Sequence, residues 1–212
     1  MVKRKLSVKI YLVALILTII VFMIGVYVGG IANITASEGL LEKMEDYYTK
    51  SNLFEIMLLS GESPSFCPLY LEELENLETK TIKLGEELDY LETVKGVYDE
   101  NLKKNYFLLE LKSYLLFEKV NSLCKTDKTI ILYFYSKDCP DCILQGKELD
   151  LISEQMKGKI RIYSFDGSIS SSAVESIKER YNITNYPSLV INGNKEEGLK
   201  NKNEINNIIN KG

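Results

Sequence analysis

The sequence contains no histidine and no tryptophan among its 212 residues, and only four prolines and four cysteines. The absence of histidine excludes Ser-His and Cys-His catalysis and the commonest zinc ligand sets. Four cysteines in a chain of this length do not make a disulfide scaffold, although an even number allows two pairs. The net charge is −4, and no long basic run follows the first ten residues. Nucleic acid is therefore not an expected partner.

A stretch without charged residues, 10–32, follows a basic N-terminal tail at 1–9. At about 1.5 Å per residue, a helix of this length crosses a hydrocarbon core of about 30 Å. A cleaved signal peptide is the alternative, because the flank is basic and Ala36 is small. Its apolar region would however exceed the usual ~7–15 residues. The sequence favours an uncleaved transmembrane helix with a single pass.

Basic residues precede this stretch, and acidic residues are the first charges after it. They are Lys3, Arg4, Lys5 and Lys9 on one side, and Glu38 and Glu42 on the other. The positive-inside bias places the N-terminus in the cytoplasm and the bulk of the chain on the outer face of the membrane. Disulfides form and persist in that compartment.

Residues 37–124 have the periodicity of a helical module: one helix capped at Ser37 and a hairpin turning at Gly96. Leucines at alternating three- and four-residue steps form a heptad seam typical of a coiled coil. They are Leu74, Leu77, Leu84, Leu88 and Leu91, with Thr81 in the missing position. A homodimer is the alternative use of this seam, and an intrachain hairpin is preferred.

The hairpin predicts that Cys67 and Cys124 lie side by side. They stand 29 residues before and 28 residues after Gly96, so antiparallel helices bring them together at the open end. A disulfide needs Cα atoms within about 7 Å, which such a hairpin supplies. We expect a structural disulfide here; two unpaired buried thiols are the alternative.

A dense apolar and aromatic run, 129–135, predicts a buried strand. Three polar residues end it, and Cys139-Pro140-Asp141-Cys142 follows. Proline is tolerated in the first turn of a helix. A buried strand that leads into C-x-x-C at a helix start is the geometry of a dithiol redox site.

The remaining patterns predict a small α/β domain over residues 128–212. Helical composition covers 140–157, with Leu144 among its apolar positions, and 159–165 alternates as a strand. Ser172 opens the next helix as a capping box with Glu175. Two short strands flank Asn192-Gly193, a strong hairpin turn, and a last helix covers 203–210. The order is β-α-β-α-β-β-α.

Two motifs make residues 128–212 resemble the thioredoxin superfamily. They are Tyr133-Phe-Tyr-Ser-Lys-Asp-Cys139-Pro-Asp-Cys142 and Tyr181-Asn-Ile-Thr-Asn-Tyr186-Pro187-Ser-Leu-Val-Ile-Asn-Gly193. The latter motif is similar to the family's segment leading into its cis-proline strand. The full chain resembles membrane-anchored thioredoxin-domain proteins of prokaryotic envelopes that carry a helical insert after the anchor.

The resemblance implies a role for each residue of the site. Cys139 attacks as the nucleophile and Cys142 resolves the mixed disulfide. Pro187 is the cis-proline, and the peptide at Tyr186 pairs with the substrate backbone. The physical chemistry agrees, because a helix N-terminus favours the thiolate of the first cysteine. No cofactor is expected besides the redox-active Cys139–Cys142 disulfide.

The residues around the pair modulate it. Lys137 supports the thiolate, whereas Asp138 and Asp141, on either side of Pro140, oppose it by like charge. A less depressed pKa for the nucleophilic cysteine than in a strongly oxidising enzyme is therefore expected. Two departures from the family matter: Tyr133 replaces a buried acid, and Asp138 replaces a tryptophan. They put in question proton shuttling by a buried carboxylate and the usual apolar substrate platform.

The sequence thus predicts a membrane-anchored thiol–disulfide oxidoreductase that acts on exported proteins. Its partners are protein thiols or disulfides, a redox partner not identified by the sequence, and the membrane through residues 10–32. The alternative is a non-catalytic helical binding or assembly protein with a redox-inert thioredoxin-like domain. No metal is expected, since zinc would have to recruit Cys67 and Cys124, and a strand of about 20 Å separates Cys124 from Cys139.

Overall fold

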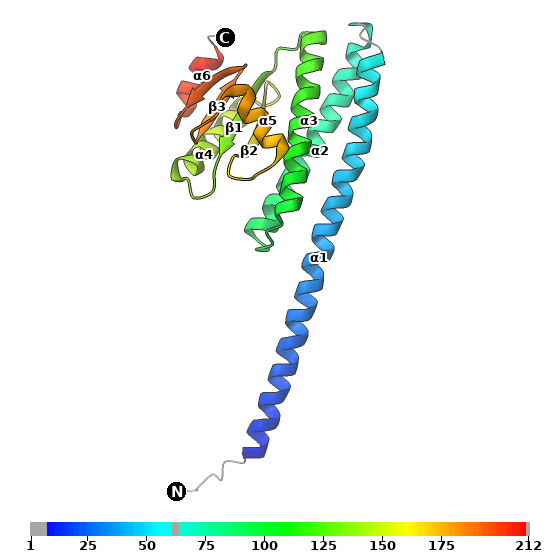
Figure 1. The fold of residues 1–212 in the computed structure, drawn as a ribbon, viewed down its shortest axis with the longest axis vertical. Coiled ribbons are helices and arrows are strands. Elements are labelled where there is room, and N and C mark those ends of the chain that lie inside the picture. Colours follow the sequence, from blue (N-terminus) through cyan, green and yellow to red (C-terminus); the bar gives the residue numbers. More distant parts are fainter. Residues whose placement is uncertain (1–7, 61–63, 211–212) are drawn as a thin grey trace.

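The computed structural model describes residues 8–60 and 64–210, so Lys3, Arg4 and Lys5 of the basic tail lie outside the described residues. In chain order the elements are α1 (Val8–Ser60), the 3-10 turn η1 (Pro64–Phe66), α2 (Cys67–Thr93), α3 (Glu100–Cys124), β1 (Thr129–Tyr135), α4 (Pro140–Gln155), β2 (Ile160–Asp166), α5 (Ser172–Tyr181), β3 (Ser188–Ile191), β4 (Asn194–Glu197) and α6 (Lys202–Ile209). Helices α2 and α3 lie along the C-terminal half of α1, and the α/β part lies beside α3 (Figure 1).

Helix α1 is unbroken over its whole length, so the predicted start of a separate helix at Ser37 is wrong. No proline interrupts the range, and the Thr35 hydroxyl donates to the carbonyl oxygen of Ile31 at 3.0 Å, within the helix. The N-terminal half is exposed and, by length and composition, apolar enough to cross a membrane. The C-terminal half buries Leu40 and Met44 against the hairpin. The apolar stretch and the first helix of the module therefore form one continuous rod.

Helices α2 and α3 form the predicted antiparallel hairpin. Gly96 in their connection has a φ of +65°, a conformation that glycine adopts without a steric cost. Asp99 caps α3, because its carboxylate accepts from the backbone N–H groups of Asn101 and Leu102 at 2.9 and 3.1 Å. The seam leucines of α2 are buried within the chain, together with Thr81. A homodimer through the module stays a prediction.

A disulfide joins Cys67 to Cys124, with a Cα–Cα distance of 5.5 Å. It closes the open end of the hairpin, opposite the turn at Gly96. Strand β1 begins at Thr129, shortly after this bond. The disulfide therefore holds together the end of the module from which the sheet starts.

The sheet has the order β2-β1-β3-β4. Strand β1 pairs parallel with β2 and antiparallel with β3, and β3 pairs antiparallel with β4. Asn192 and Gly193 both have positive φ, as a two-residue hairpin turn requires. The element order is the predicted β-α-β-α-β-β-α, with the long apolar helix and the helical module before it.

Helices cover both faces of the sheet, and one face is covered by the module itself. On that face Leu132, Phe134, Tyr163 and Phe165 share a core with buried residues of α1, α2 and α3. On the other face Ile131, Tyr133 and Leu189 pack with Leu149 and Ile152 of α4 and Ile205 of α6. The helical module and the α/β part therefore share one hydrophobic core and form a single packed unit.

Two local predictions need correction. The predicted capping box made Ser172 the N-cap of α5, but the N-cap is Ser171, one residue earlier. The Ser171 side chain makes no capping hydrogen bond, and the Ser171 carbonyl oxygen accepts from the Glu175 N–H at 2.9 Å. In α4, Leu144 is 47% exposed, whereas Gln145 is buried. The Gln145 amide donates to the carbonyl of Lys200 at 3.1 Å and accepts from its N–H at 2.8 Å, so a polar residue holds the chain leading into α6.

Candidate redox site

The C-x-x-C motif occupies the start of α4, directly beyond the end of β1. Cys139 is the N-cap residue with extended backbone angles, and Pro140 follows at the first helical position. Asp138 has a φ of +62°, a left-handed conformation that aspartate tolerates better than most side chains. The chain therefore turns sharply at Asp138 and presents the first cysteine at the mouth of the helix.

The two cysteines are joined by a disulfide, with Cα atoms 5.2 Å apart. The backbone N–H of Cys142 donates to the Sγ of Cys139 at 3.1 Å, so the first sulfur already occupies an acceptor position at the helix N-terminus. Cys142 is buried and Cys139 is half-buried. This arrangement leaves one sulfur within reach of a partner and shields the other, as attack and resolution require.

The Tyr186–Pro187 peptide bond is cis. Ser188, the next residue, pairs with Phe134 of β1, so Pro187 lies level with the end of β1 where the redox motif begins. The Tyr186 hydroxyl donates to the carbonyl oxygen of Gly167 at 3.0 Å. The ring of Tyr186 is thus directed towards the β2–α5 connection, while its backbone stays at the edge of the site.

Tyr133 of β1 contacts the C-x-x-C motif from the face of the sheet that α4 covers. Its hydroxyl donates to the carbonyl oxygen of Cys142 at 2.6 Å, and burial raises the pKa of Tyr133. The phenol therefore stays protonated and anchors the first turn of α4 where many thioredoxins have an acid. Sequence reasoning assigned Tyr133 no role; the alternation along β1, which puts it on the α4 face, was the available signal.

The hairpin turn reaches the redox loop. The Lys137 ammonium lies 5.3 Å from the centroid of the Tyr98 ring, within cation–π range. Lys103 lies 5.6 Å from the same ring and forms ion pairs with Glu92 at 3.0 Å and Asp166 at 3.7 Å. Tyr98 and Lys103 therefore lie beside the redox loop, and no local pattern in the sequence marked them. Asp138 and Asp141 are exposed beside it.

Tyr106, Glu110 and Arg161 form a buried polar cluster between the α2–α3 hairpin and the edge strand β2. Burial raises the pKa of Glu110, against the opposing charge of Arg161 and a hydrogen bond donated by the Tyr106 hydroxyl. A cavity of about 560 Å³ adjoins the cluster and reaches Tyr135 at the end of β1. Across residues 8–60 and 64–210, no group of three or more potential ligands is placed to hold a metal ion.

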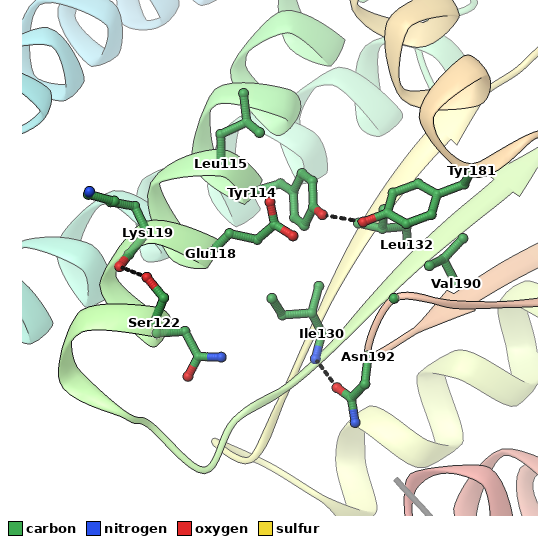
Figure 2. A pocket seen from close by; sticks show the side chains of 12 residues that line it. Tyr114, Leu115, Glu118, Lys119, Ser122, Ile130, Leu132, Tyr181, Val190 and Asn192 are labelled. Atoms are coloured by element: carbon green, nitrogen blue, oxygen red, sulfur yellow. Dashed lines mark hydrogen bonds between the residues drawn. The ribbon is translucent and has the colours of Figure 1, made fainter.

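A larger hollow, of about 700 Å³, lies at the opposite end of the sheet (Figure 2). There the hydroxyls of Tyr114 and Tyr181 lie 2.6 Å apart, and the N–H of Ile130 donates to the Asn192 side chain at 3.3 Å. Ile130 is near the start of β1 and Asn192 is in the β3–β4 turn. This hollow is therefore separate from the cysteine pair, which follows the far end of β1.

A mixed sheet with helices on both faces, a C-x-x-C pair at a helix N-terminus and a neighbouring cis-proline together define a thioredoxin-like domain. A comparison with family models agrees: residues 116–212 match the model described as a thioredoxin-like domain. Residues 116–212 therefore form a thioredoxin-like domain, as the motifs predicted. The matched range includes the end of α3, the helix that covers one face of the sheet.

Solved structures similar to the chain include three that share 21% sequence identity with it. The match to a malarial protein covers 40% of this chain and 96% of the malarial protein's chain, with a TM-score of 0.35. Chloroplastic thioredoxin z covers 43% and 83%, with a TM-score of 0.36. Thioredoxin-2, described as a component of the malaria parasite's protein secretion machinery, covers 40% and 84%, with a TM-score of 0.36. A comparison with curated proteins finds no match.

Proposed function

We propose that the protein is a membrane-anchored thiol–disulfide oxidoreductase that acts on exported proteins. The observation that carries the proposal is the half-buried Cys139 sulfur at the N-terminus of α4, where it accepts the Cys142 N–H. A thiolate at this position is stabilised by the same N–H and by the helix dipole. The Tyr186–Pro187 peptide lies level with the end of β1, where the redox motif begins, and this position supports pairing with a substrate backbone beside the Cys139 sulfur.

The exchange conserves electrons in either direction. In the reducing direction, the Cys139 thiolate attacks a substrate disulfide, forms a mixed disulfide and releases one substrate thiolate. Cys142 then attacks the Cys139 sulfur, forms the internal disulfide and releases the second substrate thiolate. Two electrons pass from the pair to the substrate, and the released thiolates take up protons from water. The oxidising direction is the reverse, with a substrate dithiol as the electron donor.

The anchor is the N-terminal half of α1. Its exposed apolar surface supports a membrane span at residues 10–32, and Lys9 marks its N-terminal side. With the N-terminus in the cytoplasm, the redox domain lies on the outer face, where the protein's two disulfides persist. A membrane-impermeant maleimide should then label reduced Cys139 in intact cells as fully as in lysed cells; labelling only after lysis contradicts this orientation.

A trapping experiment tests the activity. Cys142→Ser removes the resolving thiol, so full-length protein in membranes should accumulate mixed disulfides through Cys139 that dithiothreitol releases. Cys139→Ser is the matched control, because it keeps one thiol but removes the nucleophile, and it should accumulate none. Equal amounts of adducts for the two variants, or none for either, would sink the proposal. No adducts in either would favour a helical assembly protein with an inert redox domain.

The reduction potential of the Cys139–Cys142 pair determines the direction in which electrons flow between the protein and its substrates. Equilibration of the full-length protein with glutathione buffers, followed by thiol alkylation, measures it. A value near about −270 mV is typical of a reductase, and one near about −120 mV of an oxidant. The two acids beside the pair, Asp138 and Asp141, disfavour the thiolate and so favour the reducing end.

A further inference from the structure

Position along the axis of helix α1 gives the distance of each part of the module from the apolar stretch, which we call its height. Helix α2 runs antiparallel to it: Tyr70, near the start of α2, donates to the carbonyl oxygen of Met57 at 3.3 Å, and Lys43 forms an ion pair with Glu87 at 2.6 Å. Helix α2 ends at Thr93, six residues beyond Glu87. The hairpin turn is therefore level with about residue 37 of α1.

This height corresponds to the lipid headgroups. The proposed membrane span, 10–32, ends five residues before residue 37, so the turn lies about 8 Å beyond the end of the span along the helix. The headgroup region on each side of the hydrocarbon core is about 5–7 Å thick. The turn of the hairpin consequently reaches the outer edge of the headgroup layer when residues 10–32 span the bilayer.

The side chains at the turn suit that layer. Val94 is 65% exposed, Tyr98 54% and Tyr90 49%. The ammonium of Lys95 lies 5.8 Å from the centroid of the Tyr90 ring. Tyrosine is enriched at membrane interfaces, and lysine is attracted to anionic headgroups. We call residues 94–98 with Tyr90 the hairpin tip.

The cysteine pair lies at the same end of the molecule as the hairpin tip. Helix α3 runs from the tip to Cys124, the chain reverses, and β1 returns towards the tip before the redox motif begins. The contact between Lys137 and Tyr98 joins the two regions. Figure 1 shows the hairpin turn and the loop between β1 and α4 on the side towards which the N-terminal half of α1 extends.

We propose that the Cys139–Cys142 pair faces the bilayer and exchanges with cysteine pairs of membrane proteins held close to the outer membrane surface, with the hairpin tip in the headgroup layer. This inference rests on the proposed function and names its substrate class. The electron balance is that given above, with the membrane protein supplying the disulfide or the dithiol. The unbroken α1 and the core shared by module and redox domain hold the pair at this height.

Reporters at two heights test the substrate class. Full-length protein in vesicles is given a transmembrane peptide with a disulfide directly after its span, or the same peptide with about 30 helical residues between, which raise the disulfide about 45 Å. A soluble peptide with the same disulfide is the third substrate. We expect exchange with the near reporter at least tenfold faster than with the far one.

A variant of α1 provides the matched control. Seven residues inserted between Thr35 and Ala36, both exposed, raise the redox domain about 10 Å and nearly preserve the helix phase. The near-to-far ratio should fall severalfold, while the rate with the soluble peptide stays unchanged. Equal near and far rates with an active soluble reaction overturn this inference and leave the proposed function standing. Failure with all three substrates overturns both.

The absence of tryptophan permits a direct test of the hairpin tip. Val94→Trp places a single indole at the tip, and Phe66→Trp places one at the disulfide end, at a residue 48% exposed. In vesicles of lipids brominated near the headgroup, we expect quenching of the Val94→Trp fluorescence at least twice that of Phe66→Trp. Equal quenching of the two variants overturns the placement of the tip.

Discussion

Gly167 offers a sharp test of how the redox site is built. It follows β2, and a Cβ atom added to it would lie 2.0 Å from the Tyr186 hydroxyl oxygen and 2.3 and 2.4 Å from two ring carbons. An aromatic ring cannot yield at such distances without moving as a whole. Gly167→Ala therefore displaces the Tyr186 ring and breaks its hydrogen bond to the Gly167 carbonyl.

The expected magnitude follows from these two effects. The lost hydrogen bond costs about 1 kcal/mol, and overpacking of the ring costs about 1–3 kcal/mol. The free energy of unfolding should therefore fall by about 2–4 kcal/mol. Because Tyr186 adjoins Pro187, the shifted ring also moves the peptide that lies level with the end of β1, where the redox motif begins. Exchange with a soluble disulfide peptide should slow severalfold.

Gly146 is the matched control, since the same substitution there should have the opposite sign. It lies within α4, and a Cβ atom would meet nothing within 4 Å. Gly146→Ala should stabilise the protein by up to about 1 kcal/mol through helix propensity. Its exchange rate should stay unchanged.

The assay is urea unfolding of the full-length protein in detergent, followed by circular dichroism, beside the exchange rate. In a Tyr186→Ala background the added cost of Gly167→Ala should shrink to below about 1 kcal/mol, because the clash is gone. A cost for Gly167→Ala that is equal in both backgrounds, or below about 0.5 kcal/mol in the wild type, refutes the reasoning.

Three further predictions concern the module and the pair. Serine at both Cys67 and Cys124 opens a loop with a sequence separation of 57 and should cost about 4 kcal/mol in urea unfolding; a loss below about 1 kcal/mol contradicts this. Burial raises the pKa of Glu110 above its unfolded value, so the carboxyl group stabilises the fold only at low pH and that stability is lost as the pH rises. Glu110→Gln should accordingly raise the urea midpoint more at neutral pH than near pH 4, and an equal shift at both argues against it. Asp141→Asn removes a like charge and should lower the pKa of reduced Cys139 by about 0.3–0.5, measured by thiolate absorbance; no change would show that this charge is screened.

Local patterns in the sequence were enough to predict the element order and the thioredoxin-like fold, which the structure and the family match confirm. The reason is that strand alternation, leucine spacing and the Asn192-Gly193 turn act over a few residues and do not depend on distant contacts. The hairpin at Gly96 followed from the same kind of signal, since two long periodic runs with one glycine between them leave few other arrangements.

Tertiary packing decided the rest. Local composition proposed a break at Ser37, but packing of Leu40 and Met44 on the hairpin continues α1 through it. The contact of Lys137 with Tyr98, and the bond from Tyr133 to Cys142, join residues whose partners no local pattern names. Such pairings depend on how helices and strands distant in the sequence lie against one another. The same packing turns the cysteine pair towards the end of the molecule from which the apolar half of α1 extends.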